Sequence, residues 1–155
     1  MPVKKLKDYL DNNKIKYVVR SHSSAYTALE VAASAHVPGK ELAKTVIVKI
    51  DNKMTMVVLP ASHKIDFDLL KNAIGATQIE LATEDEFTRL FANCEVGTMP
   101  PFGNLYNMDV YIAALLTQGT DITFAAGSHS ELLTLTYKDF EKLVQPIVIA
   151  FSEPR

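Results

Sequence analysis

Apolar positions follow helical spacing at the start of the chain and then change to alternation. Over residues 3–10 the apolar side chains fall on one side of a helix, and polar residues 11–13 end this pattern. Residues 15–19 alternate between apolar and polar, as in a strand with one buried face. A capping-box spacing then introduces an alanine-rich segment, residues 27–37, which Pro38-Gly39 ends, and we predict a second helix there.

Two apolar, β-branched runs in the middle of the chain predict a hairpin. They cover residues 44–50 and 54–60, and the polar tripeptide Asp51-Asn52-Lys53 separates them. Four later segments also have the composition of strands: residues 77–81, 109–116, 121–126 and 132–137. The part from 110 to 116 contains Ala-Leu-Leu and suits a helix equally well.

Three segments share an acidic residue, a phenylalanine after it, and a leucine three positions further on. They are Asp66-Phe67 with Leu70, Glu86-Phe87 with Leu90, and Asp139-Phe140 with Leu143. Because their spacing along the chain is unequal, we interpret them as three helix beginnings and not as a repeat. The acid favours the positive end of the helix dipole, and Phe and Leu are expected to face the core.

Helices that interleave irregularly with hairpin-connected strands indicate an α+β (mixed α/β) protein. We expect a mixed sheet with peripheral helices, and not a doubly wound parallel fold. With 155 residues and 48% hydrophobic content, the chain is long enough to bury a full core, and we expect a single domain over residues 1–155.

The net charge of −2 and the isoelectric point near 6.1 exclude a protein that coats nucleic acid through bulk charge. The charge is uneven, since residues 1–20 carry six basic and two acidic side chains. This segment is either a face that meets phosphate or an ordinary solvated helix face.

The single cysteine, Cys94, excludes an intramolecular disulfide and suits a reducing compartment. The first residues do not resemble a signal peptide, and no apolar run approaches the roughly 20 residues that a membrane span needs. We therefore expect a cytoplasmic protein. His22, His36 and His63 lack paired metal-ligand spacing, so we expect neither a metal site nor a cofactor.

The segment Gly97-Thr98-Met99-Pro100-Pro101-Phe102-Gly103 brackets a Pro-Pro pair with two glycines. Proline fixes φ, whereas glycine permits a positive φ and a close approach to the main chain, so we expect a loop of one shape with exposed N–H groups. Such groups can stabilise the oxyanion of a tetrahedral intermediate in acyl transfer. A rigid tight connection is the alternative interpretation.

Two further segments can carry chemistry. Lys44 lies in Ala43-Lys44-Thr45-Val46 at the mouth of an apolar strand, where an ammonium can hold a phosphate, polarise a carbonyl, or simply be solvated. Gly127-Ser128-His129-Ser130 forms a turn between two predicted strands and places small hydroxyls beside an imidazole. No one of the three segments is specific by itself.

In this order and spacing, the segments resemble the YbaK/prolyl-tRNA synthetase-associated domain family of aminoacyl-tRNA deacylases. The resemblance covers nearly the whole chain and rests on three anchors. They are Ala43-Lys44-Thr45-Val46, then Gly97 and Pro101 in a Gly-x-x-x-Pro pattern with Phe102-Gly103 following, and Ala126-Gly127-Ser128-His129 before a Leu-x-Leu strand and the helix that includes residues 139–143. The resemblance implies a curved, mixed, largely antiparallel sheet with peripheral helices.

The same resemblance implies hydrolysis of the ester that joins a mischarged amino acid to the 3′ end of a tRNA, chiefly the proline tRNA. By position, Lys44 matches the lysine on which family activity depends, Gly97 and Pro101 match the loop that receives the scissile carbonyl, and His129 matches a pocket residue. The expected substrate-binding set is Thr45, Thr98, Met99, Pro100, Phe102, Gly103, Gly127, Ser128 and His129. The partners implied are the aminoacylated acceptor end of tRNA and a prolyl-tRNA synthetase, with no membrane.

An aminoacyl ester is already activated, so positioning a water, stabilising an oxyanion and binding the terminal adenosine are sufficient. Alanine is the expected amino acid, with serine, threonine or cysteine as alternatives. His129 is the candidate wall that excludes the larger proline, because steric exclusion discriminates better than the roughly 1–3 kcal/mol per methylene of an apolar pocket. Thr45 departs from one alanine-editing pattern, which has asparagine there.

Two other classes of function stay open. A non-catalytic module that binds charged tRNA or a synthetase could use the same surface. A small-molecule ester or thioester hydrolase could use Cys94 as its nucleophile together with His129. For a tRNA ligand we expect contact with the acceptor end alone, mostly through residues 1–20, and therefore weak binding with a shallow salt dependence.

Overall fold

The computed structural model describes residues 4–21, 41–91, 94, 97–128 and 130–154. Its helices are α1 (Lys4–Asn12), α3 (Phe67–Ile74), α4 (Glu84–Thr88) and α5 (Tyr137–Val144), with 3-10 helices η1 (Gly103–Leu105) and η2 (Ala114–Gln118). Its strands are β1 (Val18–Ser21), β2 (Ala43–Ile50), β3 (Lys53–Pro60), β4 (His63–Ile65), β5 (Ile79–Leu81), β6 (Val110–Ala113), β7 (Asp121–Ala125), β8 (Glu131–Thr136), β9 (Ile147–Ile149) and β10 (Ser152–Pro154). The predicted helix over residues 27–37 lies outside the described residues. None of the described helices combines the length and the apolar character that crossing a membrane requires.

The central hairpin is the one that the sequence predicts, with β2 and β3 antiparallel along their whole length. Asp51 and Asn52 have positive φ values of 49° and 69°, as a two-residue hairpin turn of the primed type needs. The Asp51 carboxylate also accepts hydrogen bonds from the main-chain N–H groups of Thr77 and Gln78, at 3.0 and 2.8 Å. This turn therefore fixes the segment that leads into β5.

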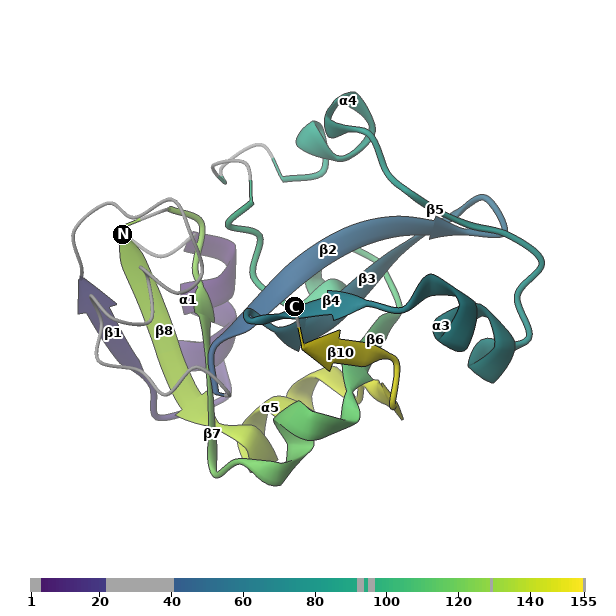
Figure 1. Ribbon diagram of the computed structural model, residues 1–155. Coiled ribbons are helices and arrows are strands. Elements are labelled where there is room, and N and C mark those ends of the chain that lie inside the picture. The colour runs from purple at the N-terminus through teal and green to yellow at the C-terminus, as the bar shows by residue number, and fades with distance from the viewer. Residues whose placement is uncertain (1–3, 22–40, 92–93, 95–96, 129, 155) are drawn as a thin grey trace.

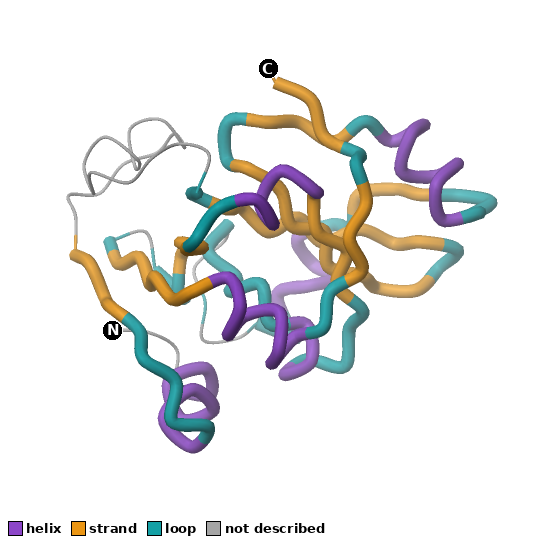
Figure 2. Tube along the Cα trace, turned by 90° about the horizontal axis from the view of Figure 1, so that it is seen from below, coloured by secondary structure: helices purple, strands orange, loops and turns teal. Residues whose placement is uncertain are grey.

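The strands form a five-stranded sheet in the order β5-β2-β3-β6-β9, a three-stranded sheet in the order β1-β8-β7, and a two-stranded sheet of β10 and β4. In the described part of the chain β3–β6 and β6–β9 are parallel pairs, and the other strand pairs are antiparallel. Figure 1 shows the three-stranded sheet on the left and the long, curved β2 and β3 reaching to the right. Seen from below, α1 and α3 lie at opposite ends of the molecule (Figure 2). The predicted α+β class with a mixed, largely antiparallel sheet is confirmed.

The five-stranded sheet is covered by apolar side chains on both faces. Along β3, Met56 and Val58 join a larger core cluster, whereas Val57 and Leu59 join a smaller one on the opposite face. Because both faces are buried, β3 has a continuous apolar sequence instead of an alternating one. The larger cluster contains aromatic rings from three distant segments, namely Phe102, Phe124 and Phe140.

The helix beginnings follow the predicted acidic residues only in part. Asp66 lies at the start of α3 as predicted, and the structure shows that it caps the helix, since its carboxylate accepts the N–H of Leu69 at 3.0 Å. α4 begins at Glu84, two residues before the predicted acid, so Glu86 lies in its first turn, where the positive end of the dipole favours it, and Thr83 is the residue that caps the helix. The N–H of Glu86 donates to the Thr83 hydroxyl at 3.2 Å, and the Glu86 carboxylate accepts the Thr83 N–H at 2.9 Å, which is a reciprocal capping box. Leu90 is 43% exposed and does not face the core.

The last helix and several strand boundaries also differ from the sequence expectation. Thr136 caps α5, so that Asp139 lies within the first turn, and Phe140 is buried as expected. The first strand begins at Val18 and not at residue 15, and the predicted strand 109–116 ends at Ala113, before η2 begins at Ala114. The three-residue strands β4, β9 and β10 have no counterpart in the prediction, because so short a run leaves too little pattern to detect.

An ion-pair network joins β2, β5 and α4. The ammonium of Lys49 lies 2.7 Å from a carboxylate oxygen of Glu86 and 3.3 Å from one of Glu80. Hydrogen bonds from Lys49 and from Thr83 lower the pKa of Glu86 from 4.5 to about 2. The same carboxylates raise the pKa of Lys49.

We expect Glu86→Gln to destabilise the protein at neutral pH and to lose this effect in acid. The folded-state pKa of Glu86 is depressed, so its contribution to stability is present above the unfolded value near 4.5 and disappears as the pH falls toward about 2. Urea unfolding at pH 7 and at pH 2 measures the difference, with Asp85→Asn as the neighbouring control. Equal destabilisation at both pH values would contradict the role of this ion pair.

Candidate functional site

The segment that enters β2 is bonded to both large sheets. Leu42 forms a parallel bridge with Thr123 of β7, and the N–H of Thr123 donates to the Glu41 carbonyl at 3.0 Å. On the side of the hairpin, the Leu42 carbonyl accepts the N–H of Ala61 at 2.7 Å. The anchor at residues 43–46 therefore starts where the two sheets meet.

The side chains of Lys44 and Thr45 start on opposite faces of β2. Thr45 lies opposite Val58, which belongs to the larger cluster, and Lys44 lies opposite Leu59, which belongs to the smaller one. Directly opposed residues of antiparallel strands share a face. Thr45 is thus on the side of the cluster that includes Met99 of the glycine-proline loop, and Lys44 is on the other side. Both residues are half-buried.

The glycine-proline loop is less exposed than its composition suggests. Gly97 is exposed and has a φ of 84°, whereas residues 98–103, which include both prolines, are buried. The ring of Phe102 lies 5.6 Å from that of Phe124 and 5.4 Å from that of Phe140, measured between centroids. The loop is therefore a wall anchored in the core, with its exposed end at Gly97.

A main-chain hydrogen bond joins this loop to the predicted histidine turn. The N–H of Gly127, which has a φ of 105°, donates to the Thr98 carbonyl at 3.0 Å. Ser128 is half-buried, and its hydroxyl oxygen lies 3.4 Å from that of Ser130. His129 lies outside the described residues. Two of the three anchors thus touch, and the strand that leads to Gly127 is the one that pairs with the entry to β2.

In the described part of this region, the groups that can contact a ligand are mainly main-chain groups and hydroxyls, and fewer of them are titratable side chains. Gly97 and Gly127 both have positive φ, and at Gly97, which is exposed, the missing side chain lets a ligand approach the backbone. The hydroxyls are those of Thr45, Thr98 and Ser128. Among the described residues, no group of three or more His, Cys, Asp or Glu side chains is placed to hold a metal ion. The arrangement suits binding and polarising an acyl group through the backbone.

Gly103, at the end of the loop, is explained by packing. A Cβ atom at this position would lie 2.5 Å from Cγ2 of Val110 and 2.6 Å from the carbonyl oxygen of Met108. The Gly103 carbonyl also accepts the N–H groups of Tyr106 and Met108, both at 2.9 Å. The sequence pattern detects this glycine but cannot tell close packing from close approach by a ligand.

Cys94 has the environment of a structural thiol. Burial raises the pKa of its thiol, and the hydrogen bond with the Tyr106 hydroxyl opposes this only in part. Burial likewise raises the pKa of Tyr106 to about 12. A nucleophilic cysteine needs a lowered pKa, so these surroundings disfavour the hydrolase that would use Cys94.

The fold of this chain is shared by two proteins of similar length whose crystal structures are known. One is a hypothetical protein with a TM-score of 0.84 and 21% identity, matched over 97% of this chain and 100% of its own. The other is a proposed trans-editing enzyme for prolyl tRNA synthetase, with a TM-score of 0.82 and 19% identity over 97% and 96% of the two chains. At these identities the likeness establishes the fold alone.

The family follows from the sequence. The model of the aminoacyl-tRNA editing domain matches residues 22–143, well over half of the 155 residues, and the chain belongs to this family. Proline–tRNA ligase 1 of Bacillus thuringiensis subsp. konkukian is 30% identical over 102 residues, which are 66% of this chain and 18% of the ligase. The ligase of Bacillus cytotoxicus is 33% identical over 81 residues, 52% of this chain and 14% of the ligase. The chain thus spans less than a fifth of these curated relatives.

We expect Gly103→Ala to lower the free energy of unfolding by about 1–3 kcal/mol, because the added methyl group overpacks against Val110 and a main-chain carbonyl. Gly119→Ala is the matched control, since its Cβ would make only ordinary contacts of 3.4 Å or more. Urea denaturation of both variants provides the measurement. If the two variants were equally stable, the packing explanation for Gly103 would be wrong.

Alkylation of Cys94 by iodoacetamide should be slow at pH 7 and should accelerate only above the ordinary thiol pKa of about 9, because burial disfavours the thiolate. The urea-unfolded protein serves as the reference and should react faster at every pH below that value. A rate profile with a midpoint near or below pH 7 in the folded protein would instead indicate an activated nucleophile.

Proposed function

We propose that this protein hydrolyses the ester bond between an amino acid and a tRNA that has been charged incorrectly, and that it acts in trans on tRNA released by a synthetase. Membership of the aminoacyl-tRNA editing domain family supports aminoacylated tRNA as the ligand. The observation that carries the proposal is the hydrogen bond of 3.0 Å from the Gly127 N–H to the Thr98 carbonyl. It holds the loop and the turn together beside the strand that pairs with the entry to β2.

The chemistry asks little of side chains. A water oxygen attacks the ester carbonyl, the carbon–oxygen bond to the ribose breaks, and the products are the free amino acid and a tRNA with its terminal hydroxyl restored. We propose that the exposed main chain at Gly97 receives the scissile carbonyl and that Gly127 and Ser128 line the opposite wall. Main-chain donors that are fixed in advance stabilise the developing oxyanion without reorganisation. A ribose hydroxyl of the tRNA assists the attacking water.

Two neighbouring residues of β2 receive different roles. We propose Lys44 as the cation for the terminal phosphate or the ester region, because a lysine stem is long and flexible. Thr45 is the polar contact on the side of the loop, since its opposed residue Val58 belongs to the larger cluster. Their starting points on opposite faces mean that single substitutions can separate the two roles.

The favoured substrate is alanine on the proline tRNA, with serine, threonine and cysteine as alternatives. Support for the proline tRNA, and for a prolyl-tRNA synthetase as partner, comes from the relatives, which are proline–tRNA ligases. We propose His129 as the residue that excludes proline by size.

We predict that the wild type deacylates proline tRNA charged with alanine and leaves the tRNA charged with proline intact. Lys44→Ala should lower kcat/KM about 100-fold, the scale of one lost electrostatic contact to the transition state. Thr45→Val should lower it about 10-fold, the scale of one hydrogen bond to a charged group. Lys64→Ala is the control and should change nothing, because it removes an exposed lysine of β4 that is paired with Glu153 of β10.

The same assay with serine and cysteine esters defines the specificity, and His129→Ala should broaden it toward proline. If the wild type bound charged tRNA and hydrolysed none of these esters, the protein would be a binding module. Full activity of Lys44→Ala with loss in Thr45→Val would move the chemistry to the side of β2 that faces the loop.

A further inference from the structure

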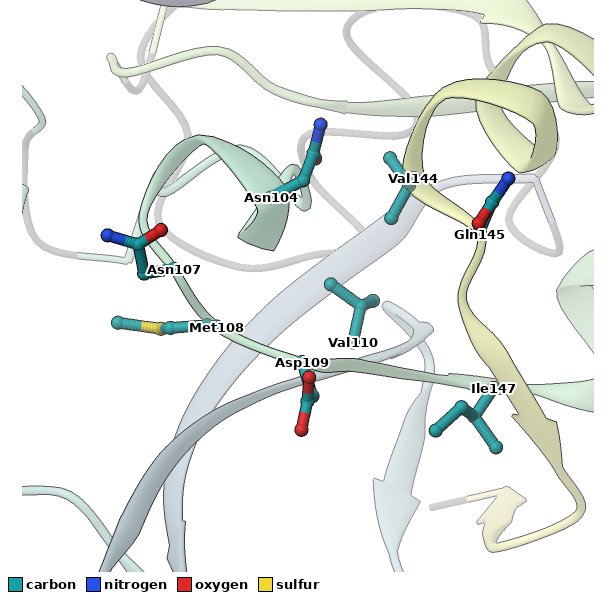
Figure 3. Close-up of a pocket in the computed structure, with 8 residues that line it drawn as sticks. All are labelled: Asn104, Asn107, Met108, Asp109, Val110, Val144, Gln145 and Ile147. Carbon is teal, nitrogen blue, oxygen red and sulfur yellow. The ribbon is translucent and has the colours of Figure 1, made fainter.

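A separate pocket opens beyond the end of the glycine-proline loop, where η1 and the turn after it face the C-terminal end of α5. Its volume is about 310 Å³. Figure 3 shows Asn104 on one side, Val144 and Gln145 on the other, and Val110 between them. Three side-chain amides line the pocket, those of Asn104, Asn107 and Gln145, and its apolar surface comes from Met108, Val110, Val144 and Ile147.

Most of the amide groups are available to a ligand. The side-chain nitrogen of Asn104 donates to the Tyr9 hydroxyl at 3.1 Å, which orients the amide and leaves its oxygen available. The side chains of Asn107 and Gln145 make no hydrogen bond within the described part of the chain, and both are exposed. Donors and acceptors are therefore presented together around one hollow.

Both of these residues hold a backbone conformation that glycine would adopt more easily. Asn107 has a φ of 56°, and Gln145, which caps the end of α5, has a φ of 52°. Left-handed conformations at residues other than glycine are unfavourable and are frequent at binding sites. Two amide side chains are thus kept on opposite walls of the pocket at positions where the backbone alone would prefer glycine.

The charge of the pocket lining is balanced, and a cation lies against Tyr106, the neighbour in the chain of one lining residue. Asp109 on its rim is paired with Lys53 at 2.9 Å, so its charge is balanced. The ammonium of Lys5 lies 4.7 Å from the centre of the Tyr106 ring. Tyr106 is the residue directly before Asn107 in the chain. Lys5 is on α1, whose Tyr9 holds Asn104. A ligand with a neutral planar part and an adjacent negative charge would match this layout.

We propose that this pocket binds one unpaired base of the tRNA and that the neighbouring phosphate lies toward Lys5. A carboxamide carries a donor and an acceptor and so pairs with the edge of a nucleobase. The apolar residues cover a flat ring, and the volume is at the small end of the range for ligand sites, which fits a single ring system. The inference rests on the proposed function, which makes tRNA the ligand, and adds a second contact outside the site of hydrolysis.

The test uses a double variant, Asn107→Gly with Gln145→Gly. It removes both side-chain amides at positions whose positive φ glycine adopts without strain. Asn52→Gly is the matched control, because Asn52 also has a positive φ, of 69°, but lies in the β2–β3 turn. Uncharged proline tRNA is titrated into each protein, and the same titration is made with the four nucleoside monophosphates. NMR of the side-chain amide signals of Asn104, Asn107 and Gln145 reports on the wild-type pocket.

We expect the double variant to bind the tRNA about ten-fold more weakly, the scale of two lost hydrogen bonds, with Asn52→Gly unchanged. The tRNA should shift the amide signals, and the monophosphates should bind far more weakly than the tRNA. Unchanged affinity of the double variant, or amide signals that do not move, would overturn the proposal. Monophosphates that bind as tightly as the tRNA would also overturn it, in favour of a free nucleotide.

Binding and hydrolysis are measured separately, so the two proposals can fail independently. If the wild type hydrolyses the mischarged tRNA while the double variant binds it as tightly as before, this pocket is wrong and the proposed function stands. If no ester is hydrolysed but the double variant loses affinity for tRNA, the pocket stands and the catalytic proposal falls.

Discussion

The double attachment of Leu42 is the constraint on which the rest of the arrangement depends. One side of this residue pairs with Thr123 in the three-stranded sheet, and the other bonds to Ala61 after the central hairpin. Strands from two sheets are thereby held at a fixed offset by buried main-chain hydrogen bonds, which are expensive to leave unmade. This junction positions the two strands that lead to the candidate site, because β2 starts there and β7 runs from there to the Gly127 turn.

The glycine-proline loop shows how a flexible element is given a fixed position. Its exposed glycine is followed by six buried residues, and Phe102 packs among rings from α5 and β7. The bond from Gly127 to Thr98 then fixes the other side of the loop. Sites built on such supported backbone lose little entropy when a ligand binds, and this is the condition for catalysis through positioning. The loop thus combines an open main chain with the rigidity of the core.

The sequence predicted the parts of this fold that have local patterns. The β2–β3 hairpin and the start of α3 at Asp66 could be predicted because turns and helix starts depend on a few adjacent residues. The acid of α4 lies in the first turn as expected, but the helix begins two residues earlier than predicted, because Thr83 and Glu86 together form a capping box. In the site, the anchors were found by resemblance, and neighbouring residues of a predicted strand must point to opposite faces, but the structure was needed to show that Thr45 and not Lys44 lies on the side of the loop. The bond from Gly127 to Thr98 joins distant segments, which no local pattern encodes.

The packing of Phe102 has a consequence for the order of synthesis. A ribosome releases a chain from its N-terminus, so the central hairpin can form early from adjacent residues. Phe102, however, rests on Phe124 and Phe140, and these rings emerge later. Until α5 has left the ribosome, the loop lacks two of the aromatic rings that hold Phe102 in place. The candidate site is therefore completed only after α5 has been made, although the anchors at residues 43–46 and 97–103 are synthesised earlier.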